Sequence, residues 1–115
     1  MGAAQKARAE IPYILGYAAL DFSGNLLDSF GEGVEISPVV ERSREIVSSY
    51  LQMYRELGEY SVGLPKEVLM STTEIFVLIR IFYNEELYQV AVLKREGNLG
   101  YTRYALQRLV KELKK

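Results

Sequence analysis

The apolar positions between Ser37 and Leu57 recur every three to four residues, which predicts one long amphipathic helix. Ser37 followed by Pro38 is a typical helix start with Ser37 as the N-cap, and Gly58 is a natural C-terminal cap. On a helical wheel the apolar side chains span about 160°, whereas covering one sheet face needs about 100°. They divide into two parallel stripes: Val39, Ile46, Tyr50, Met53 and Leu57 form the first, and Val40, Val47, Leu51 and Tyr54 form the second.

Shorter apolar runs bounded by turn-forming residues predict five strands, at residues 13–20, 25–30, 67–72, 74–83 and 87–94. Residues 74–83 are apolar on both faces, which is typical of a central strand that helices cover on both sides. Residues 67–72 have a modest apolar content and lie between charged side chains, which favours the edge of a sheet.

The two ends of the chain complete the pattern. Residues 1–10 are helix-permissive but lack large apolar side chains, so any helix there should be short or frayed. Residues 101–113 predict a last amphipathic helix after a loop at 97–100. Because most connections are hairpin-short, the strands should pair antiparallel. We therefore expect an α/β chain of the α+β kind: one domain over residues 1–115, with three α/β/α layers and a five-stranded, mostly antiparallel sheet.

Composition narrows the possible functions. The chain has 115 residues and a net charge of −1 with acids and bases interspersed, which favours neither nucleic acid nor a membrane surface as a partner. It has no cysteine and no histidine, which excludes thiolate catalysis, the usual general base and the commonest transition-metal ligands. We therefore assign no catalytic, metal-binding or cofactor-binding residue. Residues 1–10 lack the apolar run of a signal peptide, so we expect a cytoplasmic protein.

Residues 16–30, GYAALDFSGNLLDSF, gather the candidate chemistry of the chain. Asp21 opens a partial calcium-loop pattern, but Leu26 stands where the sharp turn of such a loop needs glycine. An aspartic protease needs two acidic loops, with Thr or Ser directly after each Asp, whereas Phe22 follows here. The favoured interpretation is a hairpin turn, with Asp21 capping the turn and Gly24 adopting a positive φ.

Two basic features have a structural and a functional interpretation. Arg80 interrupts the central apolar strand, and a buried arginine needs a partner. We expect its head to reach the sheet margin or a carboxylate on a covering helix, with a contact to a binding partner as the alternative. Gly97 and Gly100 lie near Lys94 and Arg95, but the Gly-Lys-Ser/Thr of a phosphate-binding loop is missing. A strand-to-helix loop is therefore favoured over a phosphate site.

The wide apolar arc of the middle helix predicts an interface. One stripe can cover the sheet while the other remains for a partner, and the edge strand at 67–72 offers a second docking surface by strand addition. We therefore expect a dimer, with burial of both stripes inside a single chain as the alternative. The expected interface residues are Val40, Val47, Leu51, Tyr54, Val68, Met70 and Thr72.

With these elements in place, the chain resembles the roadblock family, which includes dynein light chains and bacterial partners of Ras-like GTPases. The similarity rests on Ile11-Pro12, on residues 16–21 (GYAALD) and on Gly24, and it extends to Gly100 before the last helix. The resemblance implies a sheet with the long helix on one face and the terminal helices on the other. It implies homodimers formed through the middle helix and the neighbouring edge strand. It also implies a non-catalytic platform for small Ras-like GTPases, with no catalytic residue to carry over.

Other functions stay open at this point. A pocket between the sheet and a helix, lined by some of the nine tyrosines, would make the chain a small-ligand sensor. The longin and profilin-like folds share much of this architecture and would imply an adaptor domain. An enzyme would have to use Asp, Glu, Lys, Tyr, Ser and Thr alone, and no acidic pair lies at a loop junction.

Overall fold

The computed structural model describes residues 2–58 and 63–114. Helices and strands follow one another along the chain largely as the hydrophobic pattern predicts. The elements are α1 (Ala3–Glu10), β1 (Ile14–Asp21), β2 (Leu26–Gly31), α2 (Ile36–Leu57), β3 (Glu67–Ser71), β4 (Ile75–Phe82), β5 (Leu87–Lys94) and α3 (Leu99–Leu113).

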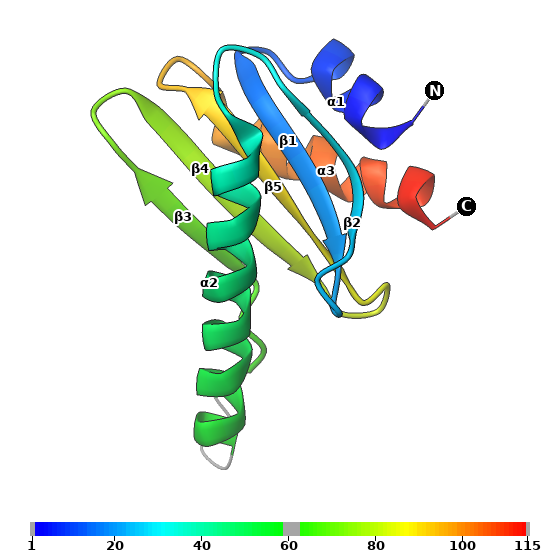
Figure 1. Cartoon of the computed structure of the whole chain (residues 1–115), viewed down its shortest axis with the longest axis vertical. Coiled ribbons are helices and arrows are strands. Elements are labelled where there is room, and N and C mark those ends of the chain that lie inside the picture. Colours follow the sequence, from blue (N-terminus) through cyan, green and yellow to red (C-terminus); the bar gives the residue numbers. More distant parts are fainter. Residues whose placement is uncertain (1, 59–62, 115) are drawn as a thin grey trace.

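The five strands form one sheet in the order β2-β1-β5-β4-β3, and every neighbouring pair is antiparallel. Helix α2 crosses one face of the sheet, while α1 and α3 lie on the opposite face (Figure 1). The expected α+β fold with three layers is confirmed, and so is the placement of the helices that the family resemblance implies. The predicted edge strand at 67–72 is indeed an edge, and the doubly apolar strand lies inside the sheet.

Alternation along the inner strands creates two hydrophobic cores. In β4, Val77 and Ile79 point to α2 and join one core, while Leu78 points to α1 and α3 and joins the other. All three side chains are buried, as is β5 from Leu87 to Leu93. A strand that is apolar on both faces is stable only when both faces are covered, which explains the need for helices on each side.

The first helix is short, as predicted, but its burial is greater than the sequence suggests. Ala3, Ala4 and Ala7 are fully buried against the sheet and α3, because small side chains let the helix approach closely. The backbone N–H of Ala4 donates to the Asp28 carboxylate at 2.9 Å, which satisfies an otherwise unpaired group in the first turn. A helix without large apolar residues is therefore held by close packing and one charged cap.

The stretch at residues 16–30 is a hairpin, as favoured. One Asp21 carboxylate oxygen accepts hydrogen bonds from the backbone N–H groups of Ser23 and Asn25, each at 2.9 Å. These bonds lower the pKa of Asp21, with the bond from Asn25 as the largest cause. Gly24 has φ +86°, the left-handed conformation that glycine adopts without strain. Asp21 thus holds the turn between β1 and β2.

Two helix starts differ from the sequence expectation. Helix α2 begins at Ile36 with Glu35 as its N-cap, so Ser37 lies in the first turn and is not the N-cap. Helix α3 begins at Leu99, two residues earlier than expected, because the Asn98 side chain accepts a hydrogen bond from the Tyr101 N–H at 2.8 Å. This cap places the expected loop glycine at position 100 inside the helix.

The head of Arg80 reaches the sheet margin, as expected, where its carboxylate partner belongs to the edge strand β3 and not to a covering helix. Its guanidinium lies 2.6 Å from Glu67 of β3, and Arg103 of α3 contacts the other oxygen of the same carboxylate at 2.8 Å. The hydrogen bond from Arg103 is the largest cause that lowers the pKa of Glu67. This shared carboxylate ties the edge strand to the sheet and to α3.

Replacing Glu67 by Gln should therefore weaken the fold in a pH-dependent way. Because the folded-state pKa of Glu67 is lowered, its contribution is complete above the ordinary pKa of about 4.3 and is lost as pH falls below that value. We expect Glu67→Gln to lower the free energy of unfolding by about 1–3 kcal/mol at neutral pH and by much less in acid.

Urea unfolding of both proteins at several pH values measures this difference. Glu45→Gln is the matched control, because Glu45 pairs with Arg42 on the exposed face of α2 and surface pairs contribute little. A difference between wild type and Glu67→Gln that stays constant from neutral to acid pH would rule out the charged interaction as its source.

Candidate partner interface

The N-terminal half of α2 is anchored to the sheet. Val40 and Val47 are 5% and 3% exposed and pack into the core between α2 and the sheet. Ser43, the polar residue on this side, is buried between them and donates its hydroxyl to the Val40 carbonyl at 2.8 Å. This half of the helix therefore keeps one fixed position on the sheet.

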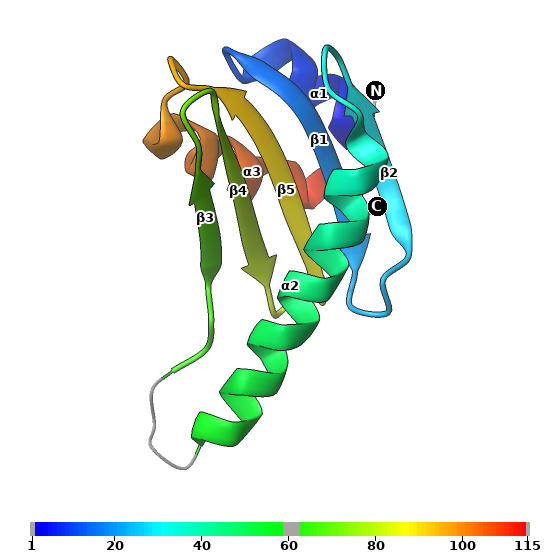
Figure 2. The ribbon, with the colours of Figure 1, turned by 60° about the vertical axis from the view of Figure 1, so that its left-hand side comes forward.

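The C-terminal half of α2 extends past the sheet, as Figure 2 shows. The helix has 22 residues and a length of about 33 Å, whereas the eight residues of β4 span about 26 Å. In this half, Met53 and Leu57 are 45% and 37% exposed. Together with Tyr50, Tyr54 and the segment that leads into β3, they line a shallow groove of about 240 Å³. Because α2 is longer than the sheet face that it crosses, the apolar side chains of its last turns remain uncovered.

Strand β3 presents a free edge beside this groove. Among the described residues it pairs only with β4. Ile81 donates to the Lys66 carbonyl at one end of this ladder, and Thr72 donates to the Ile75 carbonyl at the other. Because hydrogen-bonded pairs alternate along an antiparallel ladder, the N–H and C=O groups of Glu67, Leu69 and Ser71 point outward.

The free edge also carries apolar side chains on both faces. Met70 is 50% exposed on the face that α2 shares, and Leu69 is 41% exposed on the opposite face. An edge strand with free backbone groups and exposed apolar side chains is a template for pairing with another strand. We call Met53, Leu57, Leu64, Leu69 and Met70 the α2–β3 surface.

The seven residues expected at an interface fall into three groups. Val40 and Val47 lie in the core of the single chain, so they correspond to the sheet-facing stripe and offer no surface. Leu51, Tyr54 and Val68 are half-buried, while Met70 and Thr72 are exposed. The hydroxyl oxygen of Thr72 accepts hydrogen bonds from the N–H groups of the turn into β4, which is a local structural role.

Sequence reasoning missed part of the exposed surface. Met53 and Leu57 belong to the first stripe of the middle helix, whereas the expected interface residues of this helix come from the second. Leu64 and Leu69 are not among the expected interface residues either, although both are exposed. The length of the helix could have identified these residues. Where the turns of a helix lie beyond the end of the sheet, neither apolar stripe can pack against the sheet. Within the described residues, no three acidic side chains gather in a way that would hold a metal ion.

No helix in the described part of the chain combines the length and apolar character needed to cross a bilayer.

Comparisons with known proteins place this geometry in a wider context. No protein-family model matches the sequence, and no curated protein does so either. Solved structures do match. A Roadblock/LC7 domain from Streptomyces avermitilis superposes with a TM-score of 0.72 at 14% identity, over 95% of this chain and 89% of that one.

Two MglB structures are similar to the same degree. MglB of Myxococcus xanthus has a TM-score of 0.73 at 12% identity, covering 97% of this chain and 88% of its own. An MglB in a tetrameric arrangement has a TM-score of 0.76 at 12% identity, covering 97% and 82%. At such low identity the likeness establishes architecture, and it agrees with the resemblance seen in residues 11–24. The chain has the fold of the roadblock and MglB proteins.

Proposed function

We propose that the chain is a cytoplasmic, non-catalytic interaction module that forms a homodimer and regulates a small Ras-like GTPase. The observation that carries the proposal is the α2–β3 surface, where a free strand edge lies beside the uncovered end of a long amphipathic helix. The roadblock fold supports it, and so does the oligomeric arrangement of one similar MglB protein.

A two-fold axis through the edge of β3 explains the exposed groups. Two β3 strands then pair antiparallel around Leu69, so that Glu67 of each protomer faces Ser71 of its partner. The outward N–H and C=O groups gain partners, and the sheet continues from one protomer into the next. The apolar C-terminal half of α2 extends past the sheet on the face that Met70 shares, where a second copy would cover Met53 and Leu57.

The GTPase assignment rests on the family resemblance together with the chemistry of the chain. Without histidine or cysteine, the chain lacks the side chains that most often activate water or attack phosphorus. A module of this kind regulates hydrolysis by positioning the GTPase's own residues. The solvent face of α2, rich in charged and polar side chains such as Glu41, Glu45 and Gln52, remains available to such a partner in the dimer.

Replacing Leu69 by Pro should convert the dimer to a monomer without unfolding the chain. The Leu69 N–H points away from β4, so proline at this position removes no internal ladder bond but removes the two central hydrogen bonds between protomers. Leu69→Thr is the matched control, because it shortens the side chain and keeps the N–H. Light scattering coupled to size exclusion measures the mass, and a dimer of Leu69→Pro would exclude strand addition.

Replacing Met53 by Asp tests the contribution of α2 to the same interface. In a lone chain the change affects a 45% exposed side chain, so the free energy of unfolding should change by less than about 0.5 kcal/mol. In the dimer the carboxylate would be buried without a partner, which should weaken association at least about tenfold. Gln52→Asp adds the same charge one residue away on the exposed face, and equal dimer dissociation constants for the two variants would contradict the proposal.

The proposed regulation predicts saturable binding to a small Ras-like GTPase of the source organism. Calorimetric titration of each such GTPase, loaded with GDP or with a non-hydrolysable GTP analogue, should find one that binds the dimer with a preference for one nucleotide state. Leu69→Pro should bind it more weakly, while Leu69→Thr should not. Failure of every Ras-like GTPase of that organism to bind in either state would refute the function and leave the dimer intact.

A further inference from the structure

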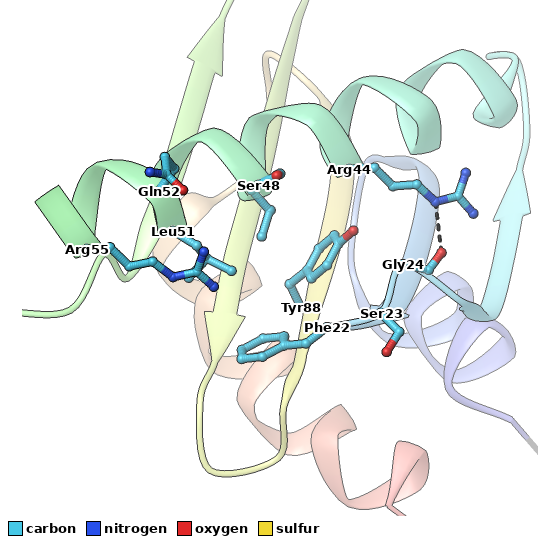
Figure 3. A pocket seen from close by; sticks show the side chains of 10 residues that line it. Phe22, Ser23, Gly24, Arg44, Ser48, Leu51, Gln52, Arg55 and Tyr88 are labelled. Atoms are coloured by element: carbon cyan, nitrogen blue, oxygen red, sulfur yellow. Dashed lines mark hydrogen bonds between the residues drawn. The ribbon is translucent and has the colours of Figure 1, made fainter.

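A second feature lies away from the α2–β3 surface. A cavity of about 330 Å³ opens between α2, the β1–β2 hairpin and β5 (Figure 3). Its volume is at the lower end of the range for small-molecule sites, about 300–1,000 Å³. The walls come from three separate parts of the chain, so a ligand here would contact α2 and the sheet together.

The floor of the cavity presents the hydroxyl of a tyrosine whose side chain is otherwise buried. Tyr88 is only 3% exposed, and its hydroxyl makes no hydrogen bond to any described residue. Figure 3 shows this hydroxyl pointing from β5 into the space below α2. The buried hydroxyl of Tyr17 is different, since it donates to Gln89, and that of Tyr83 donates to the Pro65 carbonyl. Within the described residues no buried side-chain nitrogen or oxygen lacks a partner, so the Tyr88 oxygen is open to the cavity, where a ligand atom can replace water as its partner.

The charge of the cavity wall is positive. Arg44 and Arg55 line it, and no acidic side chain does. Arg44 is held at the hairpin end, where its Nε donates to the Gly24 carbonyl at 2.8 Å and its guanidinium pairs with Glu41. Arg55 makes no ion pair or hydrogen bond with any side chain in the described part of the chain. One guanidinium is therefore free to bind an anion.

The Tyr88 hydroxyl is a donor at neutral pH. Burial raises the pKa of Tyr88, and the nearby Asp21 carboxylate adds to the rise, while Arg44 lowers it in part. The hydroxyl therefore keeps its proton and can donate a hydrogen bond to an anionic oxygen. Ser48 of α2 also lines the cavity and adds a second hydroxyl.

The remaining wall is apolar. Phe22, from the hairpin, stacks edge-on against Tyr83 with ring centroids 5.8 Å apart, which fixes its ring. Leu51 of α2 lines the same space. Small-molecule sites usually combine an apolar wall with a few polar groups that fix the orientation of the ligand.

We propose that this cavity binds a small organic anion, with its carboxylate or phosphate between Arg55 and the Tyr88 hydroxyl and its apolar part against Phe22 and Leu51. The site does not depend on the GTPase function. Because the ligand bridges α2 and the β1–β2 hairpin, its binding stabilises the folded chain in proportion to ligand concentration.

Phenyl phosphate is the probe, and benzyl alcohol is its uncharged counterpart. Titration followed by amide NMR should show saturable binding of phenyl phosphate in the millimolar range, with shifts at the hairpin, β5 and the middle of α2. Benzyl alcohol offers no anionic oxygen to Arg55. The loss of one charged hydrogen bond should weaken its binding by at least about tenfold.

Variants locate the contacts. Tyr88→Phe keeps the buried ring and removes only the hydroxyl, and Arg55→Gln changes an exposed side chain, so both should stay folded. Each should weaken phenyl phosphate binding about tenfold. Arg42→Gln is the matched control, because Arg42 also lies on α2 but pairs with Glu45 outside the cavity.

Three results would overturn the proposal. The first is the lack of saturable phenyl phosphate binding to the wild-type protein. The second is equal affinity for benzyl alcohol, which would mean that only the apolar wall binds. The third is unchanged affinity in both Tyr88→Phe and Arg55→Gln, which would place the probe elsewhere.

Discussion

The inner strands of the sheet carry apolar side chains on both faces, and covering both faces is the constraint on which the structure depends. β5 is buried along seven of its eight residues, from Leu87 to Leu93, and β4 is buried over most of its length. Removing this surface from water is the main favourable contribution to folding, and it requires a layer of helix on each side. Helices α1 and α3 provide one layer, while α2 alone provides the other.

The proposed function depends on the part of α2 that does not cover the sheet. Only the N-terminal half of the helix is needed to cover the sheet, and there Val40 and Val47 are buried. The remaining turns continue beyond the sheet and expose Met53 and Leu57 beside the free edge of β3. A single chain does not cover this surface in the described structure. The same geometry that closes one core thus leaves an exposed apolar surface, and the proposed function assigns this surface to a second copy of the chain.

The sequence predicts the layers well because periodicity reports burial. The doubly apolar run in β4, the hairpin at Asp21 and the weak edge strand were all recognisable from local patterns. Local patterns do not show which of the two stripes of α2 packs against the sheet, because a helical wheel shows only that both stripes are apolar. The sheet-facing stripe was therefore assigned to a partner through Val40 and Val47.

Other features depend on contacts between distant residues. The cap at Asn98 was visible in the sequence, but the neighbouring glycines favoured a loop. The pairing of Arg80 and Arg103 with Glu67 required the register of β3 on β4 and the position of α3. The cavity around Tyr88 required three separate segments to meet, which no local pattern encodes.

Amide hydrogen exchange at Leu69, compared with that at Met70, tests the central claim most directly. Met70 pairs within the chain with Val77, whereas the Leu69 N–H points outward and would gain a partner only in the proposed dimer. We expect slow exchange at both amides in concentrated protein, with Leu69 alone becoming fast on dilution. Fast exchange of Leu69 at every concentration, with Met70 still protected, would contradict pairing of β3 between protomers.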